Sequence, residues 1–191
     1  LGLHAGHNND ELDSTRRASI YRYRNGQYVE SNAYGSVAHQ LDDYIMGYSA
    51  PIFSPTGGVK ISAHDLATYM MMHMNYGQLN GVRIISEESA KTMQTPVWIK
   101  QTDDYYEDQY GLCLQEFVDF LDDPQYNTPA NYPVGHTGDA YGLRSLMMWS
   151  PADGWGIVAI TNGYVYNPEK DVLEALANAI YKAYFGKSQS C

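Results

Sequence analysis

The chain has 191 residues, of which 44% are hydrophobic and 18% are charged. That balance is typical of a folded globular protein and excludes a disordered tail, which would carry fewer apolar residues and more charge. No apolar run reaches the ~18 residues that a membrane span needs. The formal net charge is −10, and such a surface repels phosphate backbones. We therefore expect neither a membrane span nor a nucleic-acid partner.

The two cysteines and the N-terminal residues give little functional information. Cys113 and Cys191 are too few for a disulfide framework, so we interpret both as incidental thiols. The sequence begins at Leu1, and no basic segment with an apolar stretch follows it. It therefore predicts no signal peptide within these residues.

The first part of the chain predicts a β-hairpin and two loops. Residues 16–29 are rich in Arg and Tyr and contain Asn25-Gly26, a pair that supplies the positive φ angles of a tight turn. Residues 47–51 and 54–58 contain Gly and Pro and are predicted to be loops.

Two helices are predicted next. Ser62 is a favourable N-cap with Asp65 in the first turn, and Gly77 ends that helix. Ser86 caps a second helix, which Pro96 closes. The first helix has an apolar stripe at helical spacing, formed by Leu66, Met70 and Met74.

Residues 101–143 contain neither Lys nor Arg. We interpret this region as a solvated acidic loop flanking one strand at residues 110–117. A calcium site is the alternative, although the spacing does not match an EF-hand loop. The acidic residues concerned are Asp103, Asp104, Glu107, Asp108, Asp119, Asp122 and Asp123.

The last sixty residues are the most regular. Residues 143–149 and 155–161 are β-prone and predict an antiparallel pair. Asn167 is predicted to cap a final helix with Pro168 at its first position, and Gly186 to end it. The expected buried face of that helix consists of Val172, Leu176, Ala179, Ile180 and Ala183.

Histidines give only weak metal signals. His4 and His7 lie three residues apart near the start, and no further ligand set accompanies them. His64 and His73 lie nine residues apart on one predicted helix, so they occupy different faces and are interpreted as surface or packing residues. We expect no metal and no cofactor.

Two segments partly match catalytic motifs. Residues 47–51, Gly-Tyr-Ser-Ala-Pro, end in Pro where a nucleophile elbow needs Gly, and no clear strand precedes them. Residues 23–25 fit a Y-x-N pattern, but Asn25 is better explained by the tight turn.

Residues 135–142 are short, rich in glycine and contain a single imidazole, that of His136. One interpretation is a glycine-rich turn with a satisfied histidine. The other is a cleft edge, because Gly138 and Gly142 allow close approach to the backbone and exposed N–H groups can stabilise an oxyanion.

Several short motifs occur in a fixed order, at residues 55–59, 62–66, 81–86, 110–112, 135–138, 142–145, 149–151 and 160–162. Together with Leu1-Gly2-Leu3, this order resembles the serine β-lactamase and penicillin-binding-protein family, in particular its branch of class C β-lactamases, D-alanyl-D-alanine carboxypeptidases and esterases. The resemblance extends over nearly the whole chain.

The resemblance implies an α+β fold that is only partly present. Residues 1–130 would be the later part of a helical domain with cleft loops, and residues 131–191 the last strands and closing helix of the α/β domain. Family members are about twice as long and carry an S-x-x-K helix and a Y-x-N motif before the region of resemblance. No Ser in this sequence has Lys three residues later, so we expect a C-terminal portion that is inactive alone. Such a portion would associate with its missing half or with itself.

The resemblance also implies which residues belong to the site. His136-Thr137-Gly138 occupies the place of the usual K-T-G motif, and the N–H of Asp139 would be the second oxyanion-hole donor. A lysine at this position is a permanent cation that can hold a substrate carboxylate, whereas histidine, with an ordinary pKa of ~6.5, is mostly neutral at neutral pH. Carboxylate binding should then be weaker, which favours an esterase or peptidase over an efficient β-lactamase. The expected reaction is acyl transfer from an ester or amide in a small molecule or peptide. The alternative is a non-catalytic module that binds cell-wall peptides. The resemblance implies a periplasmic or secreted location.

Overall fold

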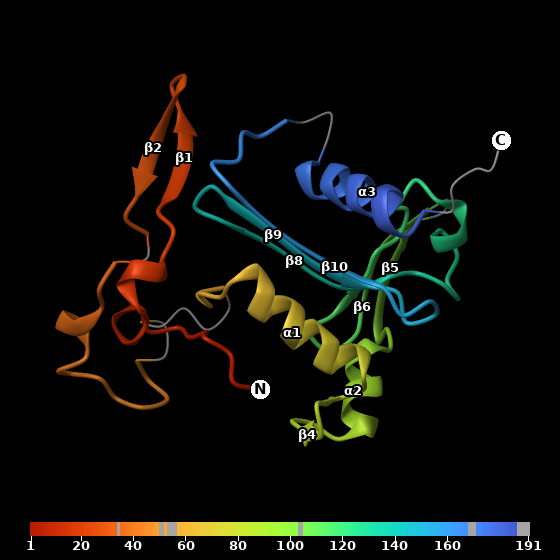
Figure 1. Ribbon diagram of the computed structural model, residues 1–191, viewed down its shortest axis with the longest axis horizontal. Coiled ribbons are helices and arrows are strands. Elements are labelled where there is room, and N and C mark those ends of the chain that lie inside the picture. Colours follow the sequence, from red (N-terminus) through yellow and green to blue (C-terminus); the bar gives the residue numbers. More distant parts are fainter. Residues whose placement is uncertain (34, 50–51, 53–56, 103–104, 168–170, 187–191) are drawn as a thin grey trace.

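The computed structural model describes residues 1–33, 35–49, 52, 57–102, 105–167 and 171–186. Its centre is a six-stranded antiparallel sheet with the order β10-β9-β8-β7-β6-β5. Helix α1 (Ala63–Met74) covers one face of the sheet and α3 (Val172–Tyr184) covers the other (Figure 1). This arrangement confirms the predicted α+β class. The strands are β5 (Trp98–Thr102), β6 (Tyr105–Tyr110), β7 (Gln115–Glu116), β8 (Val134–Ala140), β9 (Leu143–Trp149) and β10 (Gly156–Asn162).

Smaller elements surround this sheet. The hairpin of β1 (Ile20–Arg24) and β2 (Gln27–Ser31) is separate from it, as is the short pair β3 (Gln78–Leu79) and β4 (Val82–Arg83). Helix α2 (Glu87–Gln94) follows β4. Short 3-10 helices are found at Asn9–Glu11, Ser14–Arg16, Ala38–Gln40 and Pro124–Tyr126. Among the described residues, no helix has the length and apolar character to cross a bilayer.

Alternation along β9 builds a hydrophobic core on each face of the sheet. Leu146 and Met148 face α3, whereas Met147 and Trp149 face the other side, where they join Met70 of α1. From Leu146 to Trp149 the strand is buried on both faces, which explains why this part of β9 is apolar at every position. Each such side chain contributes roughly 1.5 to 3 kcal/mol by leaving water.

The local signals for turns and caps are confirmed. Asn25 and Gly26 have φ angles of 49° and 81° in the two-residue turn between β1 and β2. Ser62 accepts a hydrogen bond from the Asp65 N–H at 3.0 Å, and Ser86 accepts one from the Ser89 N–H at 3.0 Å. These caps satisfy N–H groups that the first helical turn leaves without partners.

The prediction for the start of α3 is wrong. Asp171, not Asn167, is the N-cap, and it accepts hydrogen bonds from the N–H groups of Leu173 at 2.7 Å and Glu174 at 3.3 Å. Pro168, predicted at the first helical position, lies outside the described residues. Asp171 is the stronger cap because its carboxylate also pairs with Arg144 of β9. Local sequence patterns do not indicate this pairing, since the two residues are far apart in the chain.

The buried face of α3 also differs from the prediction. Leu173, Ala177 and Tyr181 are buried, whereas Ala179 and Ala183 are exposed. The reason is a polar residue, Asn178, which is buried because its side chain accepts from the Asp122 N–H at 2.7 Å and donates to the Phe120 carbonyl at 3.0 Å. A search for apolar periodicity passes over such a residue.

The single strand predicted at residues 110–117 is split. β6 ends at Tyr110 and β7 covers only Gln115–Glu116. Between them, the Gly111 N–H donates to the Leu114 carbonyl at 2.8 Å, and a Cβ on Gly111 would collide with the Met93 carbonyl oxygen. The chain turns here because α2 approaches the backbone closely.

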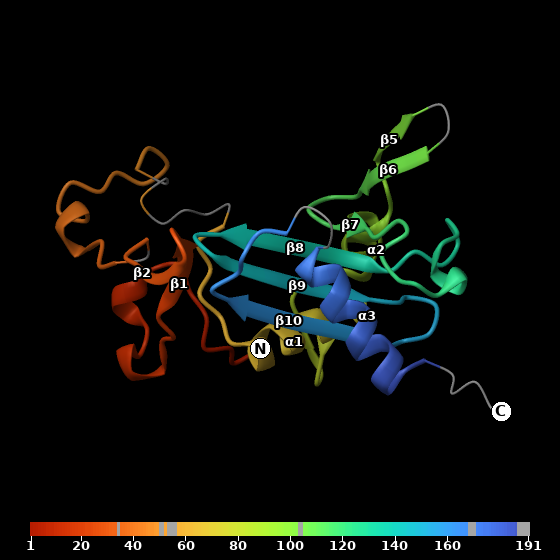
Figure 2. The ribbon, with the colours of Figure 1, turned by 90° about the horizontal axis from the view of Figure 1, so that it is seen from above.

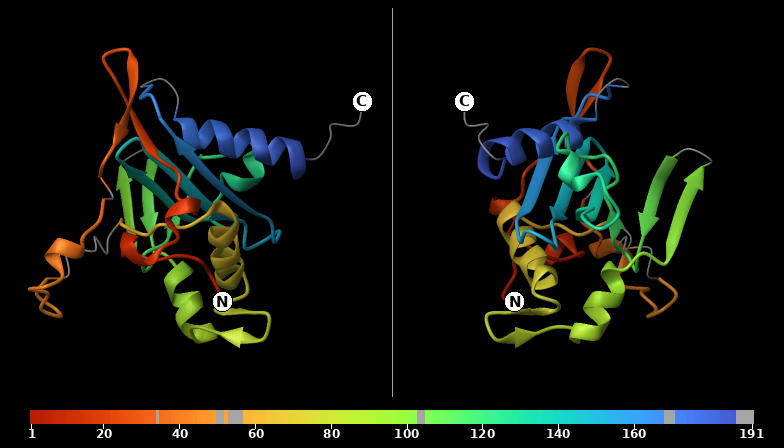
Figure 3. Two further views of the ribbon diagram at one scale, coloured as in Figure 1. Left: turned by 60° about the vertical axis from the view of Figure 1, so that its left-hand side comes forward. Right: turned by 90° about the vertical axis from the view of Figure 1, so that its right-hand side faces the viewer.

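The acidic region is partly a hairpin rather than a loop. β5 and β6 pair with each other and project from the body of the molecule (Figure 3). Asp103 and Asp104 lie outside the described residues. Within the described part of the chain, no three His, Cys, Asp or Glu side chains gather into a possible metal site, so the calcium alternative gains no support there.

Candidate active-site strand

β8 has one partly open edge. It pairs with β9 along its whole length, from Val134 opposite Trp149 to Ala140 opposite Leu143. On its other side it pairs with β7 only at Val134 and Gly135. From His136 onward, no strand of the described residues pairs with this side, and Figure 2 shows β8 extending well past β7. The four predicted site residues, 136–139, all lie on this stretch.

The backbone direction along that edge follows from the turn that ends β8. Tyr141 and Gly142 have φ angles of 58° and 98° and form a two-residue turn, so Ala140 and Leu143 are the closing pair that exchanges both hydrogen bonds. N–H groups alternate sides along a strand. The N–H groups of Thr137 and Asp139 therefore point away from β9, toward the open edge. On that side the Phe117 N–H donates to the Pro133 carbonyl at 2.8 Å. Pro133 is separated from Thr137 and Asp139 by an even number of residues, so its backbone carbonyl points in the same direction as their N–H groups.

His136 is exposed. It lies on the face of the sheet that α1 covers, because it is opposite Met147, which packs against Met70 of α1. Its Nδ1 donates a hydrogen bond to the carbonyl of Thr137. Since a carbonyl only accepts, this bond leaves Nε2 of the neutral ring as an acceptor. The ring of Tyr110 lies edge-on with centroids 6.4 Å apart, and the Tyr110 hydroxyl donates to Gln115 at 3.0 Å. The imidazole thus has a fixed neighbour at the end of β6.

Gly138 keeps the surface next to His136 flat. A Cβ at this position would lie 2.5 Å from the Ser145 Oγ on β9. Any side chain here would therefore displace Ser145. Glycine leaves the outward backbone of β8 accessible.

Asp139 directs its side chain to the opposite face, away from His136. Its carboxylate lies 3.7 Å from Arg144, which also donates to Asp171 at 2.8 Å. Burial opposes ionisation of the Asp171 carboxyl, but the Leu173 N–H and the Arg144 guanidinium outweigh it and hold its pKa below the usual value. At residue 139, then, the outward-facing group is the backbone N–H.

Glu116 is a titratable group near the strand that the sequence did not single out. It is half-buried, and burial raises its pKa to about 7. It lines an open groove of about 380 Å³ together with Lys91, Gln94 and Tyr132. A larger surface depression of about 520 Å³ is lined by residues of α2 and the segment after it, and none of residues 136–139 lines either hollow. Local sequence carries no signal that Glu116 would be buried.

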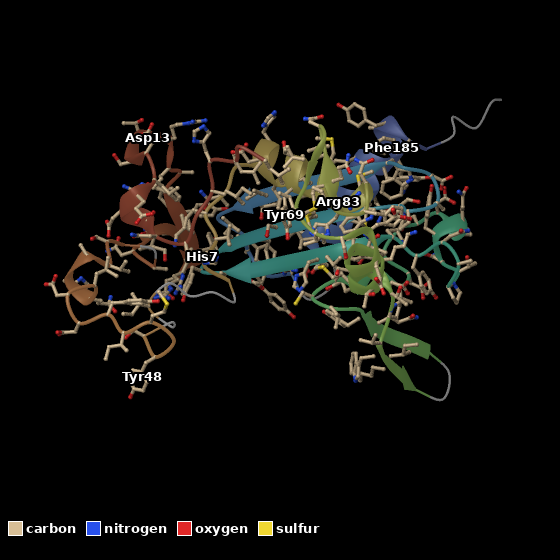
Figure 4. All side chains as sticks on the ribbon, turned by 90° about the horizontal axis from the view of Figure 1, so that it is seen from below. His7, Asp13, Tyr48, Tyr69, Arg83 and Phe185 are labelled. Atoms are coloured by element: carbon tan, nitrogen blue, oxygen red, sulfur yellow. The ribbon has the colours of Figure 1, made fainter. Side chains whose placement is uncertain are left out.

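Two other histidines, His64 and His73, have the roles that were predicted for them. His64 is exposed, and His73 is buried between Tyr69 and Trp149, which agrees with their predicted surface and packing roles. Figure 4 shows His7 and Tyr69 at separate places in the fold. Of the segment that partly matches a nucleophile elbow, Ala50 and Pro51 lie outside the described residues. Asn25 belongs to its turn, as predicted.

An antiparallel sheet between a closing helix and a second helix, with a glycine-containing strand that is partly unpaired on one side, defines a protein of the serine β-lactamase-like fold. The family model described as Beta-lactamase matches residues 2–182. The chain therefore belongs to the beta-lactamase family.

A solved structure of a D-stereospecific amidohydrolase from Streptomyces sp. has the same fold, with a TM-score of 0.54 and 16% sequence identity. The match covers 93% of this chain but 42% of the amidohydrolase chain. The present chain thus spans less than half the length of that protein. No curated protein matches the sequence.

Proposed function

We propose that this chain forms the substrate-facing strand edge of a serine hydrolase that transfers the acyl group of an ester or amide to water. The observation that carries the proposal is the outward N–H of Asp139, next to the exposed His136 on the unpaired edge of β8. Membership of the beta-lactamase family supports this reaction class. The fold likeness to an amidohydrolase supports amides among the substrates.

In this proposal the substrate carbonyl oxygen accepts a hydrogen bond from the Asp139 N–H. A serine Oγ from polypeptide outside these 191 residues bonds to the carbonyl carbon, and the leaving group departs with a proton. Water then releases the acyl group as an acid. Thr137 and Gly138 hold the edge extended, and His136 presents Nε2 beside it. The substrate is a small molecule or peptide, with peptidase or esterase activity as the finer alternatives.

A matched pair of variants tests the oxyanion role. Asp139→Pro removes the N–H without breaking the ladder to β9, because proline is tolerated where the N–H faces away from a partner strand. Asp139→Ala keeps the N–H and removes only the carboxylate. If the gene encodes a longer protein that carries the nucleophile, we expect Asp139→Pro in that protein to lower kcat for p-nitrophenyl acetate about 100- to 1,000-fold. Asp139→Ala should change kcat only a few-fold, and equal losses in both variants would contradict the proposal.

A non-catalytic module of the same fold that binds cell-wall peptides is the second candidate. The two functions differ in whether the longer protein turns over esters or amides, and in whether it carries S-x-x-K and Y-x-N before Leu1. We expect the 191-residue chain alone to hydrolyse neither nitrocefin nor p-nitrophenyl acetate. Turnover by this chain that is lost on substituting one of its serines would overturn that expectation.

We also propose that the chain associates, either with further polypeptide of the same protein or with a second copy. β10 is an end strand of the sheet, with no partner on its outer side among the described residues. Such an edge presents free N–H and C=O groups to another strand. A compact monomer in size-exclusion chromatography would contradict this.

A location in the periplasm or outside the cell is proposed on the family resemblance alone, and cell fractionation tests it.

A further inference from the structure

A row of side chains crosses four strands of the sheet and changes from apolar to polar halfway. Trp149 of β9 is opposite Val134 of β8, which is opposite Glu116 of β7, and Glu116 is opposite Gln109 of β6. Residues directly opposite each other on paired strands share one face of the sheet. This is the face that α1 covers, because Trp149 and Val134 belong to the same hydrophobic cluster as Met70. The apolar half of the row is therefore core, whereas packing does not explain the polar half.

The two polar residues of the row lack partners. No hydrogen bond or ion pair joins the half-buried Glu116 carboxyl to any residue that the structure describes. Gln109 is 4% exposed, and its Nε2 is buried without a hydrogen-bond partner. Such groups are rare in folded proteins, because each has lost the hydrogen bonds that water would supply. Their position fits a site that a ligand completes.

The groove of about 380 Å³ opens in front of Glu116. Its size lies within the range of small-ligand sites, about 300 to 1,000 Å³. Figure 2 shows α2 next to β7 and the start of β8, which are three of the segments that line it. Apolar surface comes from Val134, Tyr132 and Pro151, on three separate parts of the chain. The groove thus combines one carboxyl group with walls that suit an aliphatic chain.

The charge of the groove favours a cation. Among the described residues that line it, Lys91 is the other charged one, and Tyr76 and Tyr132 are the remaining titratable ones. The Lys91 Nζ already pairs with Glu87 at 2.7 Å and lies 5.2 Å from the centre of the Tyr76 ring. Burial raises the pKa of Glu116 to about 7, and a cation bound beside the carboxylate would oppose that effect. An external cation would therefore supply the partner that Glu116 lacks.

We propose that this groove binds a primary ammonium group on an aliphatic chain, as in a lysine side chain, with the Glu116 carboxylate as its ion-pair partner. The chain would lie against Val134 and Pro151, and the Gln109 amide, opposite Glu116, would donate to the ionised carboxylate. A metal ion fits less well, because no three described His, Cys, Asp or Glu side chains gather here. None of residues 136–139 lines the groove, so this site does not depend on the proposed function.

The first test compares two matched probes on the 191-residue chain at pH 7.5. The probes are Nα-acetyl-lysine N-methylamide and its Nε-acetylated derivative, which keeps the chain and lacks the charge. In proton–nitrogen NMR titrations, we expect the lysine compound to shift the backbone amide signals of Glu116 and Val134. It should bind about tenfold more tightly than the derivative, which is the gain from a charge-assisted hydrogen bond. Equal affinities, or shifts confined to other residues, would overturn the proposal.

Variants assign the preference to Glu116. Glu116→Gln keeps the size of the side chain, removes its charge and should abolish the tenfold preference. Glu88→Gln removes the same charge from an exposed position of α2 that lines the neighbouring depression, and it should leave the preference unchanged. The same loss in both variants would mean general attraction of a cation to an acidic protein. Thermal unfolding of each variant checks that the fold persists.

A second measurement needs no variant. Carbon-13 NMR follows the titration of the Glu116 carboxyl in the unaltered chain. Saturation with the lysine compound should lower its midpoint by about one pH unit, which corresponds to a tenfold preference for the ionised form. The Nε-acetylated derivative should leave the midpoint where it is. A midpoint that the lysine compound does not move would contradict an ion pair with Glu116.

An ammonium group can also come from the amino terminus of a peptide. Alanylalaninamide carries such a group without an aliphatic chain. Compared on the basis of its protonated fraction, we expect it to bind at least about fivefold more weakly than the lysine compound, because it buries fewer methylene groups. Equal binding would identify an amino terminus as the ligand and would contradict the need for the chain.

Discussion

Arg144 donates a hydrogen bond to Asp171 at 2.8 Å and so ties β9 to the first turn of α3. Asp171 is at the same time the N-cap of that helix. One carboxylate therefore fixes both where α3 begins and how the helix is attached to the sheet, on the face opposite to His136.

Replacing this carboxylate should cost stability. We expect Asp171→Ala to lower the free energy of unfolding by about 1 to 2 kcal/mol through loss of the cap, as measured by urea denaturation. Asp122→Ala removes a carboxylate from an exposed ion pair with Lys182 and serves as the control, with an expected loss of at most about 1 kcal/mol. The pKa of Asp171 is lowered in the folded state, so its contribution is present above its unfolded pKa and is lost as the pH falls through the folded value. Equal losses for both variants would contradict the capping role.

His73 should make the protein sensitive to mild acid. The residue is 1% exposed, neither ring nitrogen has a hydrogen-bond partner, and burial lowers its pKa. Below an unfolded pKa of about 6.5 the unfolded chain binds a proton that the folded chain resists, so stability is lost as the pH falls. We expect His73→Phe to reduce the loss of stability between pH 7 and pH 5. His64→Phe, at an exposed site of the same helix, should leave that loss unchanged. An unaltered pH dependence in His73→Phe would show that another group is responsible.

Glu116 should act in the opposite direction. Its pKa of about 7 in the folded state lies above the ordinary value of 4.5, so the folded chain holds a proton that the unfolded chain releases. Stability due to this group is present below pH 4.5 and is lost as the pH rises to about 7. We expect Glu116→Gln to raise the unfolding temperature at pH 8 and to leave it nearly unchanged at pH 4.5. Glu88→Gln, an exposed site on α2, is the control. A gain that is the same at both pH values would contradict burial as the cause.

The flat surface at Gly138 can be tested with a double-mutant cycle. Gly138→Ala should destabilise the protein by about 1 kcal/mol, because the added methyl group meets the Ser145 Oγ. In a Ser145→Ala background the obstructing oxygen is absent, and the cost should fall below about 0.5 kcal/mol. Additive losses would mean that the two residues do not meet.

Local signals in the sequence predicted much of this fold. The Asn25-Gly26 turn, the serine caps of α1 and α2 and the pairing of β9 with β10 depend on residues close together in the chain. The start and buried face of α3 and the break before β7 were predicted wrongly, because each depends on a partner distant in sequence. Those partners are Arg144 for Asp171, Asp122 for Asn178, and Met93 for Gly111.

The candidate site divides in the same way. The family resemblance implied that residues 136–139 belong to the site and that the Asp139 N–H is an oxyanion-hole donor, and this stays a prediction. The sequence did not indicate that Glu116 is buried, because its burial arises from packing between segments far apart in the chain.

The two-residue length of β7 determines how much of β8 a ligand can reach. If an insertion before Gln115 lengthened β7 by three residues, the new backbone would pair with His136, Thr137 and Gly138, because β7 runs antiparallel to β8 with Gln115 opposite Gly135. It would then occupy the backbone donors and acceptors that now face outward. A change in the length of β7 at this one place would thus change how much of the β8 edge is unpaired, without altering any residue of β8.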